Sequence, residues 1–129
     1  MESESLKQKY TILVVDDDPI IVKIVAMTIN RAGYGSTVAC NGIQALECIQ
    51  THRPDLIISD IMMPEMDGYT LLYFLKSNPE TADIPVIFLT ARDSGDDIID
   101  GIDMGAFDYL TKPFQPDELL ASIKKKLSL

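Results

Sequence analysis

Five short stretches of apolar, largely β-branched residues recur along the chain and constrain its fold more than any other feature. Their apolar character is nearly continuous instead of alternating, which is typical of strands buried on both faces of a sheet. Each interval between them is long enough for a helix, so we expect five strand–helix units in series. The predicted strands are Thr11–Val15, Ser36–Cys40, Asp55–Ser59, Pro85–Leu89 and Phe107–Thr111.

Helix start and stop signals occupy the first three intervals. Asp18 precedes a proline, which is the pattern of a capping residue before the first helical turn, and Gly33 marks the end of that helix. Asn41 and Asp67, each followed by glycine, open the second and third helices, and the third stops near Asn78. Such alternation of strands and helices predicts a doubly wound α/β fold with right-handed crossovers and helices on both faces.

The last two predicted helices differ in how strongly their residues favour a helix. Residues 95–104 include an internal glycine and several aspartates, so this segment is either a movable element or an ordinary surface helix. The fifth helix runs from Pro116 to about Leu127, with acidic residues at its start and three lysines at its end. This arrangement suits the helix dipole, so we interpret the lysines as a solvated helix end and not as a nucleic-acid patch.

The overall charge narrows the classes of partner. Eleven basic against twenty acidic residues leave a net charge of −9, which disfavours direct binding to nucleic acid or to an anionic membrane. No apolar run is long enough to span a bilayer, and no charged-then-apolar leader opens the chain, so we expect a cytoplasmic protein. Residues 1–9 are interpreted as a polar lead-in. Cys40 and Cys48 are predicted to be buried free thiols, and His52 to lie at a helix end without a metal role.

Charged or hydroxyl-bearing side chains follow four of the five predicted strands. Asp16 and Asp17 follow the first, Asp60 the third, Thr90 the fourth and Lys112 the fifth. Because functional sites of open parallel sheets lie at the carboxyl ends of the strands, we expect these side chains to converge.

Three carboxylates and one ammonium group leave this predicted cluster with a charge of −2. Two carboxylates 4 Å apart repel by about 4 kcal/mol at an effective dielectric constant near 20. A purely structural cluster would relieve this repulsion by protonation, whereas a divalent cation compensates it directly. Oxygen ligands with room for retained water and phosphate favour Mg²⁺.

Four motifs in the chain resemble those of the receiver domain of two-component response regulators, including the chemotaxis type. The resemblance covers the chain from about Thr11 to Leu127, and we expect the receiver domain to occupy residues 10–128. It implies a flavodoxin-like α/β/α fold with five parallel strands in the order 2-1-3-4-5. The motifs are ILVVDDDP at 12–19, DLIISDIMMPEMDG at 55–68, PVIFLTA at 85–91 and GAFDYLTKPF at 105–114.

The resemblance also implies a metal site and a phosphorylation site. Asp60 corresponds to the phosphoacceptor, which also contributes to the metal site. Asp17 would bind Mg²⁺ directly, Asp16 mainly through water, and Met62 through its backbone carbonyl. Mn²⁺ is a substitute that the same oxygen ligands would accept.

The remaining motif residues correspond to the switch. Thr90 would donate a hydrogen bond to a phosphoryl oxygen, and Lys112 would pair with another. Tyr109 resembles the aromatic residue that changes rotamer on activation, and the Lys112-Pro113 bond is expected to be cis.

A receiver domain of this kind is a signalling phosphoacceptor that catalyses only its own phosphorylation and dephosphorylation. Its expected partner is a histidine kinase or a histidine phosphotransfer domain, and the face of the fourth helix, fifth strand and fifth helix would control an output domain or partner. A homodimer through that face stays open, as does the choice between a stand-alone receiver and a segment of a larger regulator.

Three other functions fit the sequence less well. A metabolite phosphatase commonly needs a second acid two residues after its nucleophile, where this chain has Met62. A flavin or nucleotide carrier needs a glycine- or hydroxyl-rich loop after the first strand, where this chain has aspartates. A phosphorylation-independent adaptor would not need all of the acidic and switch positions.

Overall fold

The computed structural model describes residues 10–90 and 105–127. Within them, five parallel strands form one sheet in the order β2-β1-β3-β4-β5, which confirms the expected topology. Each strand lies within one residue of its predicted bounds. The strands are β1 (Thr11–Val15), β2 (Gly35–Ala39), β3 (Leu56–Asp60), β4 (Val86–Thr90) and β5 (Asp108–Thr111).

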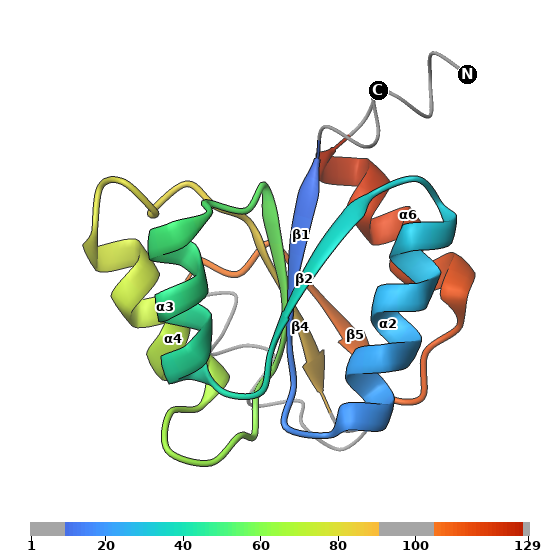
Figure 1. The fold of residues 1–129 in the computed structure, drawn as a ribbon. Coiled ribbons are helices and arrows are strands. Elements are labelled where there is room, and N and C mark those ends of the chain that lie inside the picture. Colours follow the sequence, from blue (N-terminus) through green and yellow to red (C-terminus); the bar gives the residue numbers. More distant parts are fainter. Residues whose placement is uncertain (1–9, 91–104, 128–129) are drawn as a thin grey trace.

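Helices cover both faces of the sheet and give the expected three layers. Figure 1 shows α3 (Gly42–Thr51) and α4 (Gly68–Ser77) on one side, and α2 (Pro19–Arg31) and α6 (Pro116–Lys126) on the other. The fourth predicted helix, at 95–104, lies outside the described residues. None of the helices in the described part of the chain is long and apolar enough to cross a membrane.

Side-chain caps start the helices where the sequence predicts them. Asp18 accepts a hydrogen bond from the Ile20 N–H, Asn41 from the Gln44 N–H, and Asp67 from the Thr70 N–H. These bonds satisfy amide groups that the first helical turn leaves without partners, and each contributes about 1 kcal/mol. They also determine where the chain turns from strand to helix, next to the carboxyl edge of the sheet.

The pleat of the central strands divides the hydrophobic core into two parts. Along β1, Ile12 and Val14 pack among residues of α2 and α6, whereas Leu13 and Val15 pack among residues of α3 and α4. All four side chains are fully buried, and burial of each contributes about 1.5–3 kcal/mol. The two cores hold β1 and its neighbours rigidly, which positions the residues that follow them.

The prediction of buried thiols was wrong for Cys40. Strand β2 ends at Ala39, one residue earlier than predicted, so Cys40 lies beyond the strand and its residue is exposed. Because β2 is an edge strand, its end has a neighbour on one side only. Cys48 on α3 is half-buried, and both thiols are free. His52 is the C-terminal capping residue of α3, as predicted.

Candidate functional site

Three carboxylates converge at the carboxyl edge of the sheet. Asp16 and Asp17 directly follow β1, Asp60 is the last residue of β3, and β1 and β3 are paired neighbours. One carboxylate oxygen from each lies within 4.8 Å of those from the other two. The strand order therefore gathers residues that are more than forty positions apart in the sequence.

Lys112 directly follows β5, and its ammonium group reaches past the end of β4 to this carboxylate cluster. Its Nζ lies 3.1 Å from Oδ2 of Asp16 and 3.4 Å from Oδ1 of Asp60. Its backbone N–H donates to the Thr90 carbonyl at 2.7 Å, and the peptide bond to Pro113 is cis, as expected. The ammonium group is thus directed toward both carboxylates.

Backbone groups hold two of the carboxylates in place. Asp16 is fully buried, and its Oδ1 accepts the N–H of Asp18 at 2.9 Å. Oδ1 of Asp60 accepts the N–H of Ile61 at 2.9 Å as well as facing Lys112. Among the residues that the structure describes, no hydrogen bond occupies Oδ2 of Asp60.

Glycine lets α4 approach the end of β3 closely. The N–H of Gly68 donates to the Ile61 carbonyl at 2.8 Å. A Cβ atom at position 68 would lie 2.5 Å from the Asp60 carbonyl oxygen and 2.8 Å from the Phe88 ring. Only glycine therefore fits at the start of α4, and its small size keeps the helix against the strand that carries Asp60.

The site's electrostatics favour a bound cation. Burial raises the pKa of Asp60, and the charge of Asp16 raises it further, while Lys112 and the Ile61 N–H oppose the shift. For Lys112, burial lowers the pKa, but the carboxylates of Asp60 and Asp16 outweigh it and the net pKa is raised. Lys112 therefore stays charged at neutral pH, and it neutralises only part of the carboxylate cluster.

The donor set fits Mg²⁺. Carboxylate oxygens of Asp16, Asp17 and Asp60 are hard ligands close enough together to share one ion. Asp17 is exposed, so the ion can reach the cluster and retain water. Met62 is 76% exposed, and the predicted contribution of its backbone carbonyl to the metal site stays a prediction.

The predicted switch residues occupy two adjacent strands. Thr90 ends β4, is buried, and is in register with Thr111 of β5. The half-buried Tyr109 of β5 packs its ring 5.5 Å from that of Phe88, two residues before Thr90. Phe88 in turn contacts the Tyr69 ring edge-on at 5.4 Å. Sequence reasoning missed Phe88, although its place two residues before Thr90 on one strand was a usable signal.

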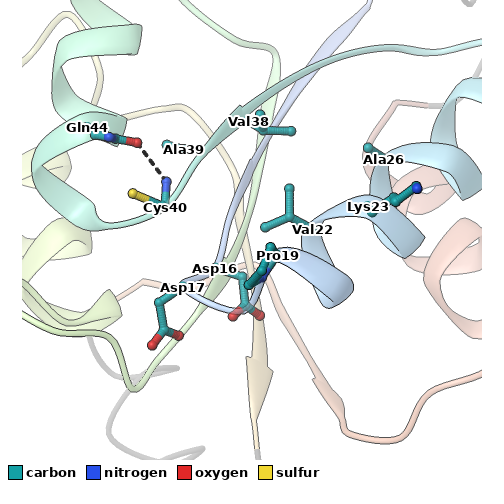
Figure 2. A pocket seen from close by; sticks show the side chains of 10 residues that line it. All are labelled: Asp16, Asp17, Pro19, Val22, Lys23, Ala26, Val38, Ala39, Cys40 and Gln44. Carbon is teal, nitrogen blue, oxygen red and sulfur yellow. Dashed lines mark hydrogen bonds between the residues drawn. The ribbon is translucent and has the colours of Figure 1, made fainter.

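A cavity of about 400 Å³ lies beside the carboxylate cluster and was not predicted. Figure 2 shows Asp16 and Asp17 at one end of it and Val38 of β2 at the opposite end, with Val22 of α2 between them. The cavity exists because β2 is the edge strand, so no further strand fills the space beside Val38. It leaves the approach to Asp17 open.

The chain matches the response regulator receiver domain family over residues 12–124. The fold and the site define a class of α/β protein that has a doubly wound parallel sheet and an acidic cluster at the carboxyl edge of that sheet. The chain therefore belongs to the response regulator receiver domain family.

Relatives with this domain extend beyond the region that they share with this chain. The DNA-binding dual master transcriptional regulator RpaA of Synechocystis sp. is 44% identical over 116 residues, which are 90% of this chain and 48% of that protein. The phosphate regulon transcriptional regulatory protein PhoB of Pseudomonas aeruginosa is 44% identical over 117 residues, covering 91% of this chain and 51% of that protein. The chain spans about half the length of these relatives.

Solved structures agree with the fold. The signal receiver domain of a signal transduction histidine kinase from Syntrophus aciditrophicus has a TM-score of 0.86 and 39% identity, covering 92% of this chain and 90% of that one. The chemotaxis response regulator CheY4 of Vibrio cholerae has a TM-score of 0.84 and 34% identity, covering 90% of this chain and 97% of that one. Similar receiver domains thus occur in a kinase and in a chemotaxis regulator.

Proposed function

We propose that this receiver domain accepts a phosphoryl group on Asp60 from a histidine kinase or a histidine phosphotransfer domain. The observation that carries the proposal is the position of Asp60: its Oδ1 is held 3.4 Å from Lys112 within a cluster of three carboxylates. We assign the domain to residues 10–128, with residues 1–9 leading into it. Its chemistry is limited to its own phosphorylation and dephosphorylation.

The transfer needs a nucleophile and a way to neutralise charge. Oδ2 of Asp60 attacks the phosphorus of a phosphohistidine, and an O–P bond forms. The P–N bond breaks, and its electron pair returns to the imidazole nitrogen of the partner. Lys112 lies where its ammonium group can pair with a phosphoryl oxygen, so the protein acts by positioning and electrostatics.

The carboxylate cluster suits a divalent ion that takes part in this reaction. We propose Asp17, Asp60 and the Met62 carbonyl as direct ligands, with Asp16 acting mainly through water. Mg²⁺ held there would supply positive charge beside the phosphoryl oxygens, and Mn²⁺ would be accepted by the same oxygens.

The response to phosphorylation would begin at Thr90. Its hydroxyl would donate to a phosphoryl oxygen and move inward, vacating space into which the Tyr109 ring turns. The packing of Tyr109 against Phe88, close to Thr90 on β4, supports this coupling. The surface of β5 and α6, together with the predicted helix at 95–104, would then change and bias a two-state equilibrium.

An exposed apolar face on α2 supports a helical protein partner. Ile20, Ile24 and Met27 recur at the spacing of one helix face, and each is 45–66% exposed. This face begins next to Asp17, so a kinase that docks on it brings its phosphohistidine close to Asp60.

The free thiols fit the reducing cytoplasm, where we expect this exchange to occur. A homodimer through the β5 and α6 surface is a further outcome that phosphorylation could favour.

Labelling with a small phosphodonor tests the proposal. The chain is incubated with radiolabelled acetyl phosphate and Mg²⁺, and the alkali-labile acyl phosphate is counted. We expect labelling of the wild type, no labelling of Asp60→Ala, and loss of labelling when EDTA removes the metal.

Asp83→Asn is the matched control, because Asp83 is an exposed aspartate that pairs with Arg53 away from the site. It should label like the wild type. Equal labelling of Asp60→Ala and the wild type would contradict the proposal.

A further inference from the structure

Strand β5 presents different groups to its two faces. Leu110 packs in the core with α6, whereas Tyr109 packs in the opposite core with Phe88. Side chains alternate along a strand, so Asp108 lies on the same face as Leu110 and beneath α6. The strand therefore separates the Tyr109 ring from the helix that contributes to the proposed output surface.

The Asp108 carboxylate accepts hydrogen bonds both from the backbone of Tyr109 and from helix α6. Oδ1 of Asp108 accepts the backbone N–H of Tyr109 at 2.8 Å. Oδ2 of Asp108 accepts the hydroxyl of Ser122, on α6, at 2.5 Å. Hydrogen bonds to an ionised carboxylate are short and about twice as strong as neutral ones, and these two share one rigid, planar group.

The other contacts of α6 with the core are mainly apolar and non-directional, and Lys126 lies over the Phe107 ring with its Nζ 5.6 Å from the ring centroid. Leu119, Ile123 and Leu127 pack into the core, and such apolar contacts have no preferred direction. Among the residues that the structure describes, the Asp108–Ser122 contact is the one side-chain hydrogen bond between α6 and the sheet. Ser122 is only 2% exposed, so its hydroxyl is shielded from water and depends on Asp108 as a hydrogen-bond partner.

We propose that Asp108 and Ser122 are positioning residues that transmit the conformation of the Tyr109 segment to helix α6. This inference rests on the proposed function, because phosphorylation of Asp60 is what would displace Tyr109. A shift of the Tyr109 backbone moves the Asp108 carboxylate, and the carboxylate draws Ser122 and α6 with it. The link adds directional coupling to a helix that is otherwise held by apolar packing.

Hydrogen exchange of the full chain tests this link, with beryllofluoride and Mg²⁺ as the phosphoryl mimic. In the wild type, the mimic should change the exchange of both the β5 segment and α6. In Ser122→Ala the change in β5 should persist, while the change in α6 should fall about fivefold, the effect of losing one hydrogen bond. Acetyl phosphate labelling of Asp60 should be unchanged in this variant.

Two further variants separate coupling from packing. Ser122→Thr keeps the hydroxyl and should restore the response of α6. Ser77→Ala removes a hydroxyl that donates to the Tyr73 carbonyl within α4, and it should respond like the wild type.

The inference is overturned if α6 of Ser122→Ala responds fully, if Ser122→Thr fails to restore the response, or if wild-type α6 does not respond to the mimic. A failure of Asp60 to accept label in the wild type would instead contradict the proposed function.

Discussion

At the scale of single residues, the charge on Asp60 opposes folding when no metal is bound. Burial and the neighbouring Asp16 raise the pKa of Asp60 in the folded chain above its value in the unfolded chain. As the pH rises between these two pKa values, the unfolded chain binds fewer protons than the folded chain. The free energy of unfolding therefore falls as the pH rises through this window. Above the folded-state pKa the loss is complete and stays constant.

Asp60→Asn should remove this penalty. In EDTA near neutral pH, we expect the variant to be more stable than the wild type by ~0.5–2 kcal/mol, the usual range for stabilising substitutions. The gain should fade on acidification to below pH ~4, where the wild-type carboxyl is protonated as well. Urea unfolding at both pH values measures the difference. A gain that grows on acidification would contradict the assigned direction of the pKa shift.

Lys112 is expected to act on the phosphoryl group and not on the metal. Its ammonium group pairs with Asp16 and Asp60, so its removal frees those carboxylates for a cation. Lys112→Ala should therefore bind Mg²⁺ at least as tightly as the wild type in a calorimetric titration. Its affinity for beryllofluoride should fall about tenfold or more, since a charge-assisted hydrogen bond is lost. Loss of Mg²⁺ affinity would contradict this role.

At the scale of secondary-structure elements, the strands and helix starts were predictable because they depend on local chemistry. Buried parallel strands require nearly continuous apolar runs, and Asp18, Asn41 and Asp67 cap the helices that they precede. The bonds that join elements were not predictable. The hydrogen bond between Asp108 and Ser122 depends on how α6 lies on β5, which residue patterns do not encode.

The contact between α4 and β3 gives a prediction at this scale. Gly68→Ala would place its Cβ 2.5 Å from the Asp60 carbonyl oxygen, so helix and strand must separate. We expect a loss of ~1–3 kcal/mol, typical of an overpacked core, in urea unfolding monitored by circular dichroism. Gly35→Ala is the control, because its Cβ would meet only ordinary contacts at 3.5 Å and beyond. Equal stability of the two variants would contradict the close approach.

At the scale of the whole molecule, topology explains why the site could be anticipated. Residues at the carboxyl ends of β1, β3, β4 and β5 must meet at one edge once the strand order is known, and that order came from the family resemblance. The exposed Cys40 and the cavity beside Val38 were missed, because the predicted strand extended one residue too far and the packing around the end of β2 depends on tertiary structure that no residue pattern shows.

The central claim is that this assembled cluster directs one phosphoryl group to one carboxylate. The most direct test treats the chain with acetyl phosphate and Mg²⁺, reduces the acyl phosphate with borohydride, and locates the reduced residue by peptide mass spectrometry. The account predicts modification of Asp60 alone. Modification of Asp16 or Asp17 in its place, or of no carboxylate at all, would contradict it.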